Sequence, residues 1–210
     1  MDLSGKVVLV FGGGKVAERK AMKFAEANAK IIVASKEFTE DLKRLRELGK
    51  ADLVEADIKT TPSLVESLIS DSNYVIAATD DSELNGEIAK MARKFGILAC
   101  AVDNPSVSDF AMPATARMGD IQIAVSTGGK SPAMARLLRK RLEEIITPED
   151  ALQVRLQSYA RKLPELSRMD KISRKDILHH IIQNQEVKRL LKEGMFEEAK
   201  IVARRIIKDR

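Results

Sequence analysis

The sequence is short of residues on which several classes of protein depend. Of its 210 residues only 4% are aromatic and none is Trp, which argues against a stacking platform for single-stranded nucleic acid. One cysteine, Cys100, rules out a disulfide within the chain. No apolar run approaches the ~20 residues that a membrane span needs, and the start, MDLSGK, lacks the pattern of a signal peptide. These absences predict a cytoplasmic protein that neither crosses nor binds a membrane.

Positive charge is in excess, and it lies toward one end. The net charge is +5, and residues 148–210 hold 15 basic and 10 acidic side chains, while residues 1–147 are balanced. A basic region of this kind can bind nucleic acid or a small polyanion. It is also typical of a solvated helical surface. Charge alone leaves these alternatives open.

Apolar, β-branched runs alternate with helical patterns in the first half of the chain. The expected strands cover 6–11, 30–35, 51–57, 73–79 and 97–102, and the expected helices cover about 16–28, 61–70 and 82–96. This alternation predicts an α/β fold with a Rossmann-like, doubly wound parallel sheet.

The pattern changes after Asp103. Residues 109–127 contain two extended segments around a Gly119-Asp120 turn, a helix is expected over 131–146, and only helical patterns follow. The sequence therefore predicts a nucleotide-binding domain over 1–112, a connecting segment over 113–147 and a small helical domain over 148–210.

A glycine-rich turn follows the first expected strand. It reads Gly12-x-Gly14-x-x-Ala17, a variant of the dinucleotide fingerprint in which the glycines allow a tight turn and close approach of a pyrophosphate. Lys15 and Val16 belong to the same turn and to the helix start, where an anion is favoured. The alternative is a glycine turn with a structural role only.

The acidic residue that usually binds the ribose is missing. The second strand ends in Ser35 and Lys36, where Asp or Glu would favour NAD. Lys36 is a candidate partner for the 2′-phosphate of NADP. It fits equally well as an exposed lysine in a turn. On these residues alone the choice of cofactor stays open.

Polar residues follow the fourth and fifth strands, at the edge where doubly wound sheets bind ligands. Thr79, Asp80 and Asn85 are candidates for contact with the sugar or amide of a cofactor, although the same stretch can simply cap a helix. Asp103 is placed to exchange a proton beside a nicotinamide, or to make an ordinary Asp-Asn-Pro turn.

A second candidate anion site precedes the helix expected at 131–146. Its candidate ligand-binding residues are Thr127, Gly128, Lys130, Ser131 and Arg136. An N-capped turn without a ligand is the alternative. His179 and His180 are adjacent and point about 100° apart on a helix, so we expect a partly buried pair and no metal site.

Four ordered stretches resemble one known family. GGGKVAERKA, VIAATDDSELN, AVDNPSVSDFAMPA and IAVSTGGKSPAMARLLRKRLE are similar to the precorrin-2 dehydrogenase family, which includes the N-terminal part of bacterial siroheme synthase. The resemblance covers residues 3–147. It implies a Rossmann domain, a homodimer formed through the segment 113–147, and NAD-dependent oxidation of precorrin-2 to sirohydrochlorin on the route to siroheme.

The resemblance also implies roles for single residues. Asp103 matches the family's general acid/base. Thr127 matches a serine that is phosphorylated in siroheme synthase, and Ser35 fits a family that uses NAD with small neutral residues at this place. Gly12, Gly14, Val16, Thr79 and Asp80 match the cofactor strip.

The implied substrate carries eight carboxylates, so basic and N–H donors are expected around it. Arg117, Lys130, Arg136 and the basic C-terminal helices are the candidates. A bifunctional dehydrogenase and ferrochelatase is the alternative within the family. A nucleotide-sensing regulator that binds nucleic acid is the alternative outside it, and the C-terminal segments show no helix-turn-helix pattern in its favour.

Overall fold

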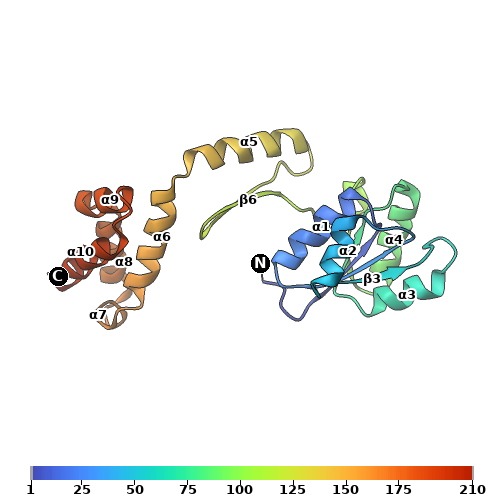
Figure 1. The fold of residues 1–210 in the computed structure, drawn as a ribbon, viewed down its shortest axis with the longest axis horizontal. Helices are drawn as coiled ribbons and strands as arrows, with labels where there is room; N and C mark the ends of the chain where they lie inside the picture. Colours follow the sequence, from blue (N-terminus) through green and yellow to red (C-terminus); the bar gives the residue numbers. More distant parts are fainter. Residues whose placement is uncertain (1, 210) are drawn as a thin grey trace. The chain divides into compact units, whose positions relative to one another are not determined.

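The computed structural model describes residues 2–209, which form two compact units (Figure 1). The first unit ends at Met112 and the second begins at Pro113. Among the described residues, no helix is both long and apolar enough to cross a membrane.

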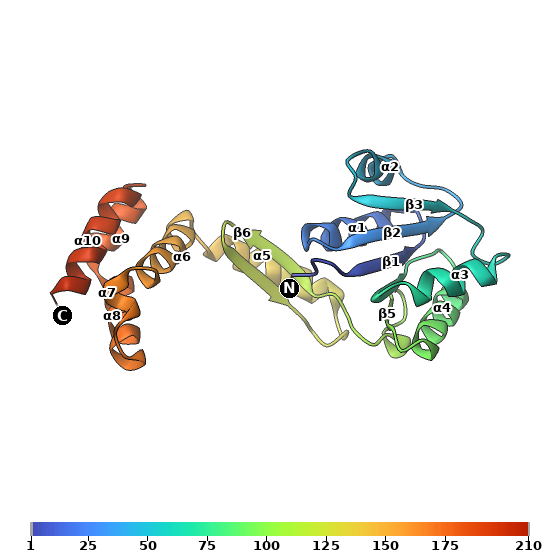
Figure 2. The same ribbon diagram turned by 90° about the horizontal axis from the view of Figure 1, so that it is seen from below.

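The first unit is built on a parallel sheet of five strands, seen in Figure 2. The strands are β1 (Val7–Phe11), β2 (Lys30–Ser35), β3 (Ala51–Glu55), β4 (Tyr74–Ala77) and β5 (Leu98–Ala101). Their order is β3-β2-β1-β4-β5, and all neighbours are parallel. The predicted Rossmann-like sheet is confirmed. Its order reverses between β1 and β4, where such sheets bind ligands at the carboxyl ends of the strands.

Helices cover both faces of this sheet because every second strand residue points to the same side. Val8 and Val10 pack against α1 (Lys15–Glu26) and α2 (Glu40–Glu47). Leu9 and Phe11 face the other layer, α3 (Pro62–Ser70) and α4 (Ser82–Lys94). These four of the five β1 residues are fully buried, as expected for a central parallel strand.

The sequence did not predict α2. Thr39 caps this helix by accepting a hydrogen bond from the Leu42 N–H, and Leu42 is its one buried residue. An eight-residue helix with one buried side chain carries little apolar periodicity, so the pattern that identifies longer helices is too weak here.

The second unit begins with an antiparallel hairpin and a helix. Strands β6 (Ala114–Met118) and β7 (Ile121–Val125) pair across the predicted turn, where Gly119 has a φ of 57°. Helix α5 (Pro132–Ile145) packs on both strands. Within this segment only Ala116 and Ala135 are buried among the described residues.

A helical bundle completes the second unit. Its helices are α6 (Pro148–Arg161), α7 (Pro164–Ser167), α8 (Lys171–Gln183), α9 (Gln185–Lys192) and α10 (Phe196–Lys208). Gly194, with a φ of 74°, ends α9 and separates it from α10. The expectation that His179 and His180 are partly buried is wrong, because both side chains point outward from α8 and are exposed.

Candidate active site

The turn after β1 is packed so tightly that two of its residues have no room for a side chain. Gly12 has a φ of 112°, and a Cβ there would overlap the carbonyl oxygen of Ala78. A Cβ on Gly13 would overlap the carbonyl oxygen of Glu37 and lie 2.9 Å from the Ser35 Oγ. The fingerprint did not single out Gly13, because it treats this position as variable. Gly12 and Gly13 thus fix the turn against the ends of β4 and β2.

The next residues open the turn to solvent. Gly14 is exposed, and a Cβ at this position would meet no atom within 4 Å. It is the N-cap residue of α1, and no side chain forms a capping hydrogen bond there. Lys15 and Val16 are exposed, while Ala17 is fully buried against the sheet. Exposed residues therefore surround the start of α1, and the free N–H groups of a helix start can bind a phosphate.

Both candidate lysines near this turn already have acidic partners. The Lys15 ammonium lies 3.0 Å from Glu18 and 3.4 Å from Asp41, and the hydrogen bond to Glu18 raises the pKa of Lys15. Lys36 Nζ lies 2.9 Å from the Asp57 carboxylate, and this bond lowers the pKa of Asp57. The charge of Lys36 is thus balanced by Asp57, which follows β3.

The loop after β4 presents Thr79 and Asp80. Asp80 is exposed and Thr79 is half-buried. The next residue, Asp81, caps α4 by accepting hydrogen bonds from the N–H groups of Glu83 and Leu84, and it pairs with Lys59 at 2.6 Å. Capping therefore falls to Asp81, which leaves the Asp80 carboxylate exposed for a ligand.

Asn85 is fully buried, so the predicted contact between its side chain and a cofactor is wrong. Its Oδ1 accepts hydrogen bonds from the N–H (3.0 Å) and hydroxyl (2.7 Å) of Thr79. Its Nδ2 donates to the Thr79 carbonyl at 3.2 Å and to Asp103 Oδ1 at 3.3 Å. A sequence shows that Asn85 is one turn into a helix, but not that the turn is packed inward.

Asp103 stands just beyond β5 with its side chain exposed. Hydrogen bonds from Ser108 and Asp109 fix the loop that carries Asp103. Ser108 Oγ bonds to Ala101 and to the Asn104 carbonyl at 3.0 Å each, and Asp109 bonds to the Ala99 N–H at 2.9 Å.

Asp109 Oδ1 also accepts a hydrogen bond from the Arg93 Nε–H at 2.7 Å. Although partial burial opposes its ionisation, the Ala99 N–H and the Arg93 guanidinium keep the pKa of Asp109 below its ordinary value. These bonds fix the loop on the first unit and leave the Asp103 carboxylate facing outward.

The remaining sequence-predicted residues lie in the second unit. Arg117, Lys130 and Arg136 are exposed. The Thr127 hydroxyl accepts from the Ser131 N–H at 3.1 Å and donates to the Ser131 carbonyl at 3.0 Å. Gly128 has a φ of 60°. Ser131 caps α5 through the Met134 N–H. The turn is therefore N-capped, and its basic residues are available to solvent.

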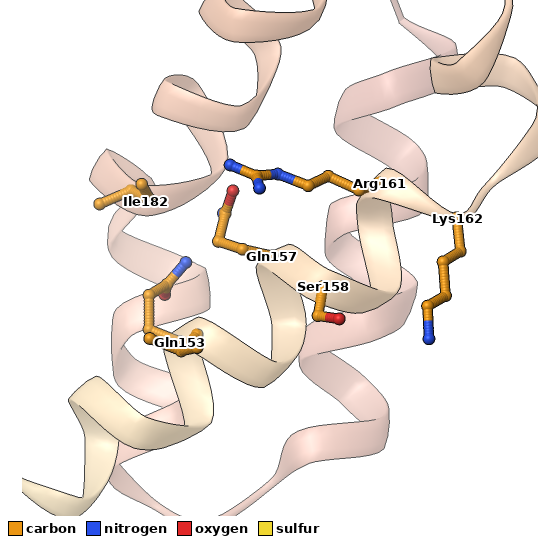
Figure 3. Close-up of a pocket in the computed structure, with 7 residues that line it drawn as sticks. Gln153, Gln157, Ser158, Arg161, Lys162 and Ile182 are labelled. Atoms are coloured by element: carbon orange, nitrogen blue, oxygen red, sulfur yellow. The ribbon is translucent and has the colours of Figure 1, made fainter. Parts of the chain in front are cut away.

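The helical bundle contains a pocket that the sequence did not reveal (Figure 3). It has a volume of about 540 Å³ and lies along α6 and beside Ile182 of α8. Gln157 and Arg161 point into it with Gln153, whose buried Nε2 has no hydrogen-bond partner within the structure. No acidic residue lines the pocket, so its donors suit an anion.

A resident metal site is absent from the part of the chain described. Residues 2–209 contain no group of three or more His, Cys, Asp or Glu side chains placed to hold a metal ion. The one cysteine, Cys100, is a buried free thiol in β5, and burial raises its pKa.

Known proteins match the chain along most of its length. Residues 1–114 match the family of NAD(P)-binding domains, and residues 119–145 match the central part of sirohaem biosynthesis proteins. The chain is 37% identical over 188 residues to the precorrin-2 dehydrogenase of Methanosarcina barkeri, which covers 89% of this chain and 83% of that protein. The first unit is therefore an NAD(P)-binding domain.

Longer proteins match the chain over part of their length. Siroheme synthase 1 of Aeromonas salmonicida is 37% identical over 144 residues, which is 69% of this chain and 30% of that protein. Among solved structures, the precorrin-2 dehydrogenase SirC superposes with a TM-score of 0.73 at 21% identity, over 94% of this chain and 97% of that one. This superposition supports the fold in both units.

Proposed function

Because the chain belongs to the precorrin-2 dehydrogenase family, we propose that it oxidises precorrin-2 to sirohydrochlorin with NAD in siroheme biosynthesis. The observation that carries the assignment to a site is the link from Thr79 through Asn85 to Asp103. It joins the cofactor edge of the sheet to an exposed carboxylate.

The residues of the first unit fit a dinucleotide. Gly12 and Gly13 let the turn pack closely against the carbonyls of Ala78 and Glu37. No side chain caps the start of α1, so its N–H groups are offered to a pyrophosphate. Gly14, Val16, Thr79 and Asp80 would line the cofactor, with Ser35 near the adenine ribose. The Asp57 partner of Lys36 favours NAD over NADP, since a 2′-phosphate would have to compete with this carboxylate.

When bound, NAD supplies the hydride acceptor. Removal of a hydride and a proton from precorrin-2 gives sirohydrochlorin, NADH and H⁺. Asp103 takes up that proton as general base, because its carboxylate is exposed at the strand edge and is held by the Asn85 amide. It then releases the proton to solvent.

We assign recognition of the substrate carboxylates to the second unit. Its candidates are the exposed Arg117, Lys130 and Arg136 and the turn of Thr127, Gly128 and Ser131. The pocket lined by Gln157, Arg161 and Lys162 is a further candidate, since a guanidinium and an ammonium group both bind carboxylates. The basic excess of residues 148–210 would serve this substrate.

We propose that the protein acts as a homodimer in the cytoplasm. Helix α5 leaves an apolar face exposed, at 43% for Met134, 42% for Leu137, 38% for Leu142 and 69% for Ile145. A contiguous apolar face of this kind marks an interaction site, and the segment that carries it buries little by itself. The free thiol of Cys100 suits a compartment that keeps thiols reduced.

The test is Asp103→Ala, assayed for turnover and for NAD binding. We expect kcat for sirohydrochlorin formation to fall by about 10²–10⁴-fold, while the Kd for NAD, measured by calorimetry, stays within about threefold of the wild-type value. Full turnover by this variant would remove Asp103 from the mechanism. Addition of Fe²⁺ in the same assay tests the alternative that the protein also inserts iron.

A further inference from the structure

Asn85 uses every hydrogen-bonding group of its side chain inside the protein. Two bonds reach its Oδ1 and two leave its Nδ2, and the side chain has no exposed surface. Three of the bonds join it to Thr79, at the carboxyl end of β4, where the cofactor is proposed to bind. The fourth goes to Asp103, 18 residues further along the chain. One amide thus joins the ends of two neighbouring strands, β4 and β5.

The Thr79 backbone fixes which end of the amide faces Asp103. If the oxygen and nitrogen of Asn85 were exchanged, the oxygen would face the Thr79 carbonyl and the NH₂ would face the Thr79 N–H. Both contacts would be repulsive, and a buried polar group without a partner costs about 1–3 kcal/mol. The orientation with Nδ2 toward Asp103 is therefore the one the backbone permits.

This orientation makes the two oxygens of Asp103 unequal. Oδ1 accepts the Asn85 N–H and must stay an acceptor. Within residues 2–209, the hydrogen bond to the Asp103 carboxylate reaches Oδ1 and none reaches Oδ2. Oδ2 is therefore available to the substrate. A proton taken from the substrate would then be held at Oδ2.

We propose that Asn85 is a positioning residue for the dehydrogenation: it orients Asp103 so that Oδ2 takes the proton, and it ties that carboxylate to the Thr79 backbone beside the cofactor. The proposal rests on the proposed function, since it takes Asp103 as the base. Misplacement of a catalytic group by about 1 Å can cost 10²-fold in rate, so the effect of Asn85 should fall on kcat.

Two substitutions separate positioning from a purely structural role. Asn85→Ala removes all four bonds. Asn85→Asp keeps an acceptor for the Thr79 N–H and hydroxyl, but a carboxyl can donate to Asp103 only while it is protonated, and two adjacent carboxyls share a proton less readily as the pH rises. The second variant therefore keeps the two Thr79 bonds that Oδ1 accepts and loses the amide bond to the Thr79 carbonyl. It can donate to Asp103 only while its own carboxyl is protonated, so this contact becomes dependent on pH.

The experiment measures kcat and the Kd for NAD between pH 6 and pH 9, with wild type at each pH as reference. We expect Asn85→Ala to lower kcat at least about 10-fold at every pH. For Asn85→Asp we expect kcat relative to wild type to fall at least about fivefold from pH 6 to pH 9, while its Kd for NAD stays within about threefold of wild type at each pH.

The control is Asn73→Ala, just before β4. It removes another bond from a backbone N–H to an asparagine, the 2.9 Å bond from the Val7 N–H, at the opposite ends of the strands. We expect its kcat to equal the wild-type value. A kcat ratio for Asn85→Asp that is independent of pH, or a loss that is matched by weaker NAD binding, would overturn the proposal. If wild type itself does not turn over precorrin-2, the proposed function fails instead.

Discussion

At the scale of single residues, the glycine turn meets two separate demands. Gly14 leaves space for a ligand, whereas Gly12 and Gly13 leave space for the protein's own backbone. The fingerprint in the sequence identifies Gly12 and Gly14 from the ligand's side. The demand on Gly13 comes from Glu37 and Ser35, and it is invisible until β2 is placed beside β1.

We expect Gly13→Ala to weaken both folding and cofactor binding. A Cβ at this position overlaps the Glu37 carbonyl, which is backbone and cannot move away cheaply, so the free energy of unfolding should fall by about 1–3 kcal/mol. The Kd for NAD should rise at least about 10-fold. Gly86→Ala is the control, because a Cβ there meets no atom within 4 Å; equal behaviour of the two variants would contradict the packing argument.

We propose that one contact, the ion pair of Lys36 with Asp57, sets the preference for NAD over NADP. In Asp57→Asn, Lys36 loses its charged partner and becomes available to a 2′-phosphate. Because exposed ion pairs are weak, we expect NADP to bind only about two- to fivefold more tightly and NAD to change by less than twofold, as measured by calorimetry. A gain shared by both cofactors would show that Asp57 acts on something other than the 2′-position.

At the scale of elements, the loop from Asp103 to Asp109 depends on the hydrogen bonds that Asp109 accepts at its end. The folded state lowers the pKa of Asp109, so it favours the ionised carboxylate. That stabilisation is fully present above the ordinary aspartate pKa of about 3.9. It is lost as the pH falls through the lower, folded-state value.

We therefore expect Asp109→Asn to lower the free energy of unfolding by about 1–2 kcal/mol at pH 7. The difference in unfolding free energy between wild type and variant should narrow below about pH 4. Urea denaturation at pH 7 and below about pH 4 measures this difference. Asp71→Asn, at an exposed aspartate, serves as the comparison and should show a small gap at each pH. A gap for Asp109→Asn that is the same at both pH values would refute this account of the loop.

The sequence predicted long, strongly patterned elements better than short ones. All five strands of the sheet, the hairpin turn at Gly119 and the helix after Ser131 are found where apolar runs and turn residues placed them. Helix α2 and the four-residue α7 are too short for a pattern. The break at Gly194 was hidden because apolar residues continue at helical spacing on both sides of it.

The site shows the same division. Asp103 and Thr79 could be found because they follow strands whose carboxyl ends must share an edge. The burial of Asn85 and the pairing of Lys36 with Asp57 depend on contacts between distant segments, which one sequence without relatives does not reveal. The exposure of the two histidines was missed because helical spacing places them on different faces without saying which face is covered.

At the scale of the whole molecule, the exposed face of α5 makes a second copy of the chain the expected partner. We predict that Leu137→Glu, which places a charge on this apolar face, yields monomers in size-exclusion chromatography with light scattering, because an unpaired charge is not tolerated in an apolar interface. Lys140→Glu adds the same side chain at an exposed, non-apolar position of α5 and should leave the dimer intact. Wild type that elutes as a monomer would contradict the dimer.

An anaerobic assay of the purified protein shows whether this chain couples the reduction of NAD to the oxidation of precorrin-2. Precorrin-2 is supplied with NAD⁺, with NADP⁺ or with neither, and sirohydrochlorin and NADH are followed by absorbance. We expect equal amounts of sirohydrochlorin and NADH, formed fastest with NAD⁺. Absence of sirohydrochlorin with either cofactor, from folded protein that binds NAD, would contradict this expectation.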